Sequence, residues 1–392
     1  MRLRFPPSAA LLGGVAALAG GAAALAAAPA PANLQEYKEA FQDRILLPGK
    51  AAPISGVEVT VESYEKIEYK PKSGALQTRK PEEVASIQYA DTLPEYTRAL
   101  EAWKQGRWAD AEQDFRGLRS AVSAGKARKM WDARAMAYVA DCRRRMAFKE
   151  KSPAKLLEAA ETFAKAEKAD PKSPLLDLVL LGRAECLSAA GKHDDGLAAC
   201  DDLKTIAGTA SLPLWEARAR RLKGRILEQK GEVAAAANEY QDLANFAGGK
   251  AAGAPSGTPL RTELEALKVD GLVSKGWAIF GRAEKTRTDG DIDAARAFFE
   301  SLPASTGSDE AGRAASLNGL GAVLLLQGKP KEALDKFLTV EVTLFAVPSE
   351  VTRSLWYKAK AYEQLGDQSG CEAALKDLVE LYPWSEWATR AR

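Results

Sequence analysis

The sequence predicts a mostly α-helical protein, an α-solenoid of about seven helical hairpins that follows a small antiparallel β barrel. Three observations lead to this fold class. About one residue in five is alanine, which favours helix. A fixed spacing of small residues, glycine and an aromatic residue recurs from residue 93 to the C-terminus. A stretch near the N-terminus alternates apolar and polar residues, as half-buried strands do.

The composition excludes several classes of function. The 392 residues include 55 Lys+Arg and 53 Asp+Glu, for a formal charge of +2. Proteins that bind nucleic acid usually carry a basic surplus, so this balance argues against a nucleic-acid partner. Apolar residues make up 46% and charged residues 28%, as in ordinary globular proteins. His193 is the sole histidine, which excludes a metal site with several histidines.

Residues 1–28 predict a secretory signal peptide. Two arginines precede an uncharged run rich in Ala, Gly and Leu at 8–28, and small-x-small cleavage sites follow. We therefore expect a periplasmic or secreted protein, neutral once Arg2 and Arg4 are removed. The alternative is an uncleaved anchor, because about 20 residues suffice to cross a bilayer. The leader is the only segment where we expect membrane contact.

Residues 34–92 predict the β-barrel domain. Five short segments, separated by Gly, Pro and Ser, alternate apolar and polar residues. One of them, Gly56–Glu62, places three valines on one face. Pro81–Glu83 predicts one helical turn before the last strand. The set resembles a small SH3-like or Sm-like barrel. Such barrels bind peptides or RNA, or serve as packing modules, and the lack of an aromatic cluster favours packing.

From residue 93 one pattern recurs. A small residue is followed by Gly seven positions later, Ala five after that, and an aromatic four after that. The glycine lies where a helix must end, and it adopts the left-handed cap at little cost. The small residues allow two helices to approach, and the aromatic fills the space between them. The copies begin at Ala99, Ala147, Ala184, Gly224, Ala283, Gly321 and Ala359, with turn positions Gly106, Ala154, Gly191, Gly231, Gly290, Gly328 and Gly366.

This pattern resembles the tetratricopeptide repeat (TPR) family over about 300 residues, and stacked hairpins of this length form an α-solenoid. Asp170-Pro171 and Tyr382-Pro383 supply the family's closing proline. Cys200, Cys371 and Pro330 depart from the pattern. The composition of 248–259 predicts a flexible linker, so we expect hairpins 1–4 in 93–250 and hairpins 5–7 in 260–392.

A search for catalytic motifs finds none. The sequence has no phosphate-binding loop, no GxGxxG after a strand and no GxSxG elbow. We therefore predict no catalytic residue, no cofactor and no metal. His193 follows the turn glycine Gly191, where a side chain packs or faces solvent. Cys186 and Cys200 either pair across one hairpin or are buried thiols, and the helix–helix positions favour thiols.

The resemblance implies that the first helix of each hairpin lines a concave face. Arg218, Arg221 and Arg225 recur at spacings of three and four, which places them on one helix face. A basic groove with aromatic anchors suits an acidic peptide or a carboxylate terminus. The alternative is a solvated basic face balanced by neighbouring acids, with the aromatics in the core. The predicted site residues are Arg144, Arg218, Arg221, Arg225, Trp277, Phe280, Arg353, Trp356 and Lys360.

Together these observations predict a non-enzymatic scaffold of the bacterial cell envelope that binds a protein or peptide. One alternative is an accessory subunit of an envelope assembly or secretion machine. A less favoured alternative is an enzyme with a carboxylate pair in the groove, although the acids are scattered and no pair stands out. The sequence leaves the partner and the oligomeric state open.

Overall fold

The computed structural model describes residues 42–72, 74–90 and 92–391, and the predicted leader at 1–28 lies outside them. The described chain divides into two compact units. Unit 1 comprises the described residues up to Cys142 together with Lys168–Leu176, and unit 2 comprises Arg143–Glu167 and the chain from Asp177 onward. Across the described residues, no helix combines the length and the apolar character needed to span a bilayer.

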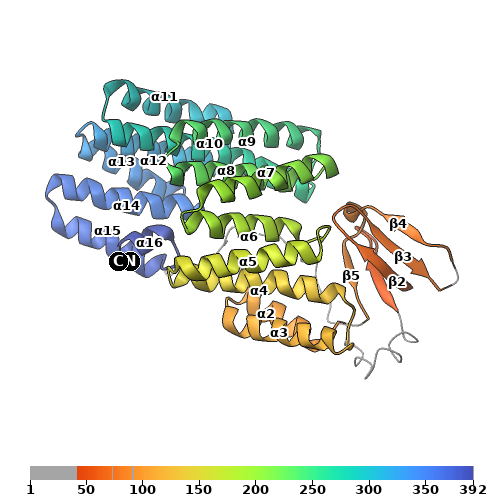
Figure 1. The fold of residues 1–392 in the computed structure, drawn as a ribbon. Coiled ribbons are helices and arrows are strands. Elements are labelled where there is room, and N and C mark those ends of the chain that lie inside the picture. The colour runs from red at the N-terminus through yellow and green to blue at the C-terminus, as the bar shows by residue number, and fades with distance from the viewer. Residues whose placement is uncertain (1–41, 73, 91, 392) are drawn as a thin grey trace. The chain divides into compact units, whose positions relative to one another are not determined.

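Unit 1 contains a five-stranded antiparallel sheet (Figure 1). The strand order is β4-β3-β2-β1-β5, and the predicted helical turn precedes β5 as the 3-10 helix η1. The predicted barrel is not formed, because the sheet is open and β4 and β5 are its two edges. Each edge strand has only three residues, too few to supply the staggered pairing that closes a barrel. The bounds are β1 Asp43–Leu46, β2 Ile54–Glu62, β3 Ile67–Pro71, β4 Gln77–Arg79, η1 Pro81–Glu83 and β5 Ser86–Gln88.

The sheet shares one hydrophobic core with the helices that follow it. Alternation along β2 buries Val57 and Val59 on one face, as the sequence predicted. They join a cluster with Phe115 of α3 and Trp131 of α4. The helices of this region are α2 Pro94–Lys104, α3 Trp108–Ser123 and α4 Met130–Lys149.

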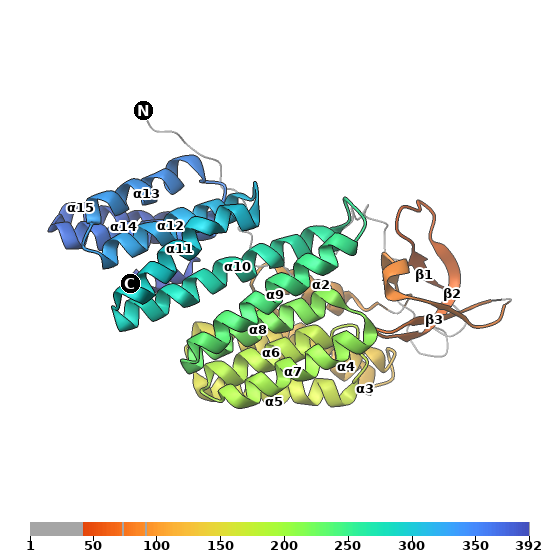
Figure 2. The same cartoon turned by 90° about the horizontal axis from the view of Figure 1, so that it is seen from above.

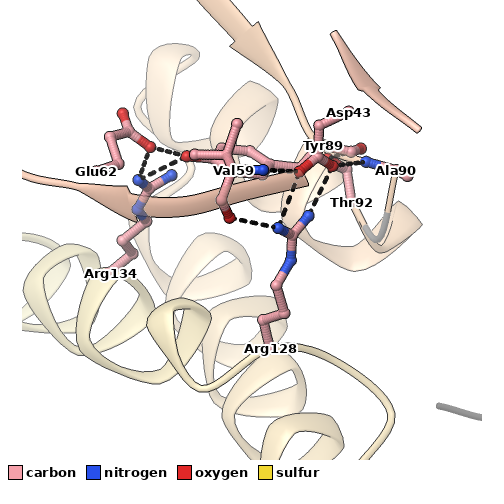
Figure 3. A network of polar contacts seen from close by, with 8 residues as sticks. All are labelled: Asp43, Val59, Glu62, Tyr89, Ala90, Thr92, Arg128 and Arg134. Atoms are coloured by element: carbon pink, nitrogen blue, oxygen red, sulfur yellow. Dashed lines mark hydrogen bonds and ion pairs between the residues drawn. The ribbon is translucent and has the colours of Figure 1, made fainter. Parts of the chain in front are cut away.

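A buried ion pair joins β1 to the residues just before α4 (Figure 3). The Asp43 side chain is fully buried and accepts hydrogen bonds from the backbone N–H groups of Val59 and Ala90, both at 2.9 Å. Arg128 donates to both carboxylate oxygens, at 2.7 and 3.0 Å, and to the Val59 carbonyl at 3.1 Å. Asp43 is therefore a junction at which two strands and the α4 region meet.

A second ion pair lies beside the first (Figure 3). Arg134 of α4 pairs with Glu62 of β2, and the Tyr89 hydroxyl also donates to Glu62. The guanidinium carbons of Arg128 and Arg134 lie 4.8 and 5.2 Å from the centre of the Tyr89 ring. Burial raises the pKa of the Tyr89 phenol. The phenol therefore stays protonated, which keeps it a hydrogen-bond donor to Glu62.

Helices α2–α15 form seven consecutive hairpins followed by a short helix, which confirms the predicted helical-repeat solenoid. In unit 2 each helix from α7 to α15 packs against the next (Figure 1). The remaining helices are α5 Pro153–Ala169, α6 Leu176–Ala189, α7 His193–Ala210, α8 Pro213–Lys230, α9 Val233–Gly253, α10 Pro259–Thr286, α11 Asp289–Thr306, α12 Glu310–Leu326, α13 Pro330–Thr343, α14 Pro348–Leu365, α15 Gln368–Leu381 and α16 Glu386–Ala391.

The hairpin turns use the left-handed conformation as predicted, with two exceptions in residue type. Five predicted turn glycines have a positive φ, namely Gly106, Gly191, Gly231, Gly328 and Gly366. The second and fifth hairpins use Lys151 and Arg287 instead, at φ 52° and 56°. The predictions of Ala154 and Gly290 as turn residues are wrong, because α5 already begins at Pro153 and α11 at Asp289. Thr288 caps α11 by accepting from the Asp291 N–H, so the turn ends before the glycine.

Small residues and aromatics interlock between the two helices of a hairpin. A Cβ on Gly224 would lie 2.4 Å from the ring of Tyr240, and one on Gly321 would lie 2.5 Å from the ring of Phe337. Tyr240 and Phe337 are at most 1% exposed. The recurring spacing therefore has the packing role that the sequence suggested.

The predicted linker at 248–259 is mostly helical, which corrects that expectation. Helix α9 continues to Gly253 because Ala247 and Ala251 are buried beside Leu264 of α10. Only 254–258 connect the two helices. Pro330, which departs from the repeat pattern, is the first residue of α13, a position where its missing N–H costs nothing.

Candidate functional site

The first helices of successive hairpins pack on one another in unit 2. Helix α8 contacts α10, α10 contacts α12, and α12 contacts α14. Figure 2 shows the long α10 running from α9 toward α11 and α12. We call the face formed by α4 (from Arg143), α6, α8, α10, α12 and α14 the first-helix surface.

A cavity of about 270 Å³ opens on the first-helix surface. Its lining comes from the first helices of hairpins 2, 3 and 4 alone. Polar and apolar side chains both contribute, which is usual for ligand sites. The lining residues are Arg144 and Phe148 of α4, Glu185, Ser188 and Ala189 of α6, and Leu222, Arg225, Ile226 and Gln229 of α8.

Two arginines share one carboxylate in this cavity. Arg144 pairs with one oxygen of Glu185, and the Arg225 Nη1 lies 3.7 Å from the other. The Arg225 side chain is 51% exposed, whereas that of Arg144 is 16% exposed. The three residues leave one positive charge in excess. Arg225 is therefore the cation best placed to receive an anionic group from solution.

A hydrogen-bond chain forms the polar end of the cavity. The Ser188 hydroxyl donates to Gln229 Oε1 at 2.6 Å, and its oxygen lies 3.0 Å from His193 Nδ1. His193 is half-buried at the start of α7. The histidine positions Ser188, as expected of a residue beside a turn, while Gln229 retains an amide NH₂ that suits a peptide carbonyl.

Arg218 and Arg221 lie on the same helix face as Arg225 but have closer acidic partners. Arg218 pairs with Asp177 of α6 at 3.0 Å and with Glu263 of α10 at 2.9 Å. Arg221 pairs with Asp270 of α10 at 2.7 Å. For these two arginines the geometry favours the alternative of a basic face balanced by acids.

Three of the predicted residues form an aromatic cluster on α10 and α14. Phe280 is 2% exposed and belongs to the core. Trp277 stacks on Tyr357 with centroids 5.6 Å apart and planes 13° apart. The Arg353 guanidinium lies 4.4 Å from the centre of the Trp277 ring and pairs with Glu350. These contacts hold α10 against α14. They give Trp277, Phe280 and Arg353 a structural role in packing the two helices together.

The last two predicted residues lie farther along α14. Trp356 packs on Trp387 of α16 with ring centroids 5.8 Å apart. Lys360 lies 5.5 Å from the centre of the Trp356 ring and pairs with Glu363 at 2.9 Å. Of the nine predicted residues, the structure brings Arg144 and Arg225 together in the cavity and leaves the other seven outside its lining.

The sequence analysis missed Phe148, Glu185, Ser188 and Gln229. A signal for them was present in the repeat register. Arg144, Glu185 and Arg225 are 41 and 40 residues apart, and so are Phe148, Ala189 and Gln229. Equivalent positions of stacked repeats lie side by side. Aligning first helices by position, rather than by basic charge, would have found the cavity.

Glu228 is a partly buried acid three residues after Arg225, and it accepts a hydrogen bond from the Tyr240 hydroxyl at 2.6 Å. Burial raises the pKa of the Glu228 carboxyl. That hydrogen bond and the positive charges of Arg225 and Arg353 oppose the rise, while Glu386 adds to it. Charged residues of α8, α14 and α16 therefore all influence the pKa of Glu228.

Metal and cysteine chemistry receive no support from the part of the chain that the structure describes. Those residues contain no cluster of three or more His, Cys, Asp or Glu that could hold a metal. Cys186 and Cys200 are buried thiols rather than a disulfide. Burial raises the pKa of Cys200 to about 12, which keeps it protonated and unreactive.

Comparisons with known proteins give structural likenesses alone. No family model matches the chain, and no curated protein sequence matches it. The apo form of RapI is 10% identical with a TM-score of 0.46, over 76% of this chain and 79% of that one. A tetratricopeptide repeat protein from Parabacteroides merdae is 13% identical with a TM-score of 0.46, over 76% and 95%. NprR in complex with its cognate peptide NprX is 13% identical with a TM-score of 0.39, over 76% and 80%.

Proposed function

We propose that this chain is a non-enzymatic interaction scaffold that binds a peptide segment of a partner protein on the first-helix surface. The observation that supports it most is the cavity lined by α4, α6 and α8 alone. Three first helices supply side chains from equivalent repeat positions. An extended peptide crossing these three helices would contact a different side chain at the equivalent position of each one.

The cavity favours a peptide with an acidic group next to an apolar side chain. Arg225 is half-exposed and only loosely paired at 3.7 Å, so a ligand carboxylate can bind it without displacing a close partner. Phe148, which is 40% exposed, offers an apolar surface in the same cavity. Gln229 is placed to bind the peptide backbone. Specificity would then come from shape and charge with no covalent step.

We further propose that the scaffold acts in the bacterial cell envelope after export. The support is the leader-like composition of 1–28. N-terminal sequencing of the protein purified from its native cells should begin after residue 28, in a periplasmic or secreted fraction. Recovery of full-length chain from the cytosol would contradict export. Recovery of full-length chain with the membrane would instead indicate an uncleaved anchor.

A photo-crosslinking amino acid at position 148 tests the peptide site directly. Phe148 lines the cavity, so illumination in cells should give a discrete adduct with one partner. The matched control is position 365, where Leu365 is 37% exposed outside the cavity. Equal adducts from both positions, or none from position 148, would count against the site.

A pair of arginine substitutions on one helix tests the charge requirement. Arg225→Glu should abolish recovery of the crosslinked partner. Arg221→Glu is the control, because Arg221 is one turn away, 45% exposed, and outside the cavity lining. Thermal unfolding of each variant separates loss of binding from loss of fold. Partner recovery that survives Arg225→Glu would overturn the charge requirement.

An accessory role in an envelope machine predicts that the adduct contains a subunit of that machine.

A further inference from the structure

An apolar patch lies on unit 2 outside the cavity, at the end of α13 and the start of α14. Along the end of α13, Val342 is 71% exposed, Phe345 64% and Leu338 40%. Their spacing of four and three places them on one stripe of the helix and the turn after it. We call this surface the α13 patch. Its exposed residues are Leu338, Thr339, Val342, Thr343, Phe345, Ala346, Pro348 and Ser349.

The patch carries no charge, although 28% of the chain's residues are charged. The one acid within 338–349 is Glu341, which is turned away from the stripe and pairs with Lys358 of α14 at 2.6 Å. Monomeric proteins rarely expose a contiguous apolar surface of this kind, and such surfaces usually mark an interface.

The end of α15 extends the patch. Leu381 is 65% exposed and Trp384 48%. Leu378 and Tyr382, which flank Leu381, pack in the same core cluster as Val340 and Leu344 of α13. The exposed apolar residues of α13 and α15 therefore lie at the same end of the last two hairpins.

We propose that a second copy of this chain covers the α13 patch, through a two-fold contact in which α13 meets its counterpart. An uncharged surface meets itself without repulsion, as a contact between identical faces requires. The charges at its edge have both signs. The exposed charges of α15 before Leu381 are Lys376, Asp377 and Glu380, and Lys376 Nζ lies 4.0 Å from Glu380 Oε1. In an antiparallel arrangement the lysine of each copy can face the glutamate of the other. An anionic membrane would instead call for a basic edge.

The contact is smaller than a standard dimer interface. About 20–30 residues a side are usual for a stable complex, and the patch with Leu381 and Trp384 supplies about half the lower number. We therefore expect a dimer that forms and dissociates with concentration. This inference is independent of the peptide site, because none of the cavity residues belongs to the patch.

Sedimentation of the chain without residues 1–28, over a hundredfold range of concentration, tests the proposal. The mean mass should rise from monomer toward dimer. Val342→Lys combined with Phe345→Lys should leave a monomer at every concentration, because four lysines would meet at the two-fold axis. Leu365→Lys is the matched control and should still dimerise. A monomeric unsubstituted chain, or a dimer unchanged by the double substitution, would overturn the proposal.

A cysteine crosslink locates the contact. Val342→Cys should form a disulfide-linked dimer under mild oxidation, and Leu365→Cys should not exceed the unsubstituted chain. Equal crosslinking from both positions would contradict a contact at α13. Flotation with phosphatidylcholine vesicles tests the alternative that a membrane surface covers the α13 patch. A chain that is monomeric in solution and floats through Val342 and Phe345 would replace the dimer with a membrane surface.

Discussion

Arg128 and Arg134 of unit 1 differ in burial from Arg225 of unit 2, although all three lie beside a carboxylate. In unit 1 the Arg128 and Arg134 side chains are 15% and 10% exposed, and Asp43 opposite Arg128 is fully buried. In unit 2 the Arg225 side chain is 51% exposed and 3.7 Å from its carboxylate. A buried, fully bonded arginine holds a fold together, whereas a half-exposed, loosely paired one is available to a ligand. The residue type alone does not distinguish the two roles.

The largest expected effect is in unit 1. Asp43→Ala removes the acceptor of two backbone N–H groups and of Arg128, leaving a buried charge without its counterion. Breaking one side of a buried pair costs about 3–5 kcal/mol. Hydrogen exchange of the β2 amides should accelerate accordingly. Asp293→Ala is the control, because Asp293 is 64% exposed, 3.4 Å from Arg296, and should change stability by at most about 1 kcal/mol. Similar exchange in both variants would erase the contrast between the units.

A smaller effect is expected at the hairpin packing of unit 2. Gly224→Ala places a methyl group 2.4 Å from the Tyr240 ring and should destabilise unit 2 by about 1–3 kcal/mol. Gly249→Ala, in the neighbouring helix, meets no atom within 4 Å and should stabilise the chain by about 0.4–1 kcal/mol. Urea denaturation of both variants should show a lower free energy of unfolding for Gly224→Ala and a higher one for Gly249→Ala. Destabilisation by both would mean that backbone freedom, rather than close approach, selects glycine at position 224.

A pH effect should appear at Glu228. Its pKa is raised in the folded protein, so the folded state holds a proton that the unfolded state has released. Stability from this group is therefore highest below the unfolded pKa, falls as pH rises through the folded pKa, and is then constant. Glu228→Gln keeps an acceptor for Tyr240 and removes the titration. The stability of this variant relative to the unsubstituted chain should rise between pH 4 and pH 7. A difference that stays constant with pH would contradict the assignment.

The smallest effect on stability is expected at Arg225. Arg225→Gln removes a long, exposed ion pair, so the free energy of unfolding should change by about 0.5 kcal/mol or less. Partner capture should nevertheless fall. If the substitution destabilises unit 2 as strongly as Gly224→Ala, Arg225 is a structural residue like those of unit 1.

Much of the helical architecture follows from local rules. Ala99, Ala111 and Phe115 satisfy the small–Ala–aromatic spacing, and all three are fully buried. Such positions lie where the two helices of one hairpin approach each other, so periodicity finds them. The continuation of α9 through 248–253 was missed because glycine-rich composition suggests a linker, while the burial of Ala247 and Ala251 against α10 is a tertiary effect.

The site was less predictable for the same reason. The partners of Arg218 come from 41 residues earlier and 45 later in the chain. The spacing of the arginines along one helix predicts that they share a face. It carries no information about the acids on the neighbouring helices. Barrel closure likewise depends on whether the two edge strands meet, and strand alternation carries no information about that.

The ion pairs of unit 1 also set an order of assembly during synthesis. Asp43 and Arg128 are 85 residues apart, and Lys172, which pairs with Glu65 at 2.7 Å, is 107 residues from it. Contacts of such separation form slowly, because a long loop must close first. During synthesis Asp43 therefore meets its counterion only after Arg128 has been added to the chain, and Glu65 meets Lys172 later still.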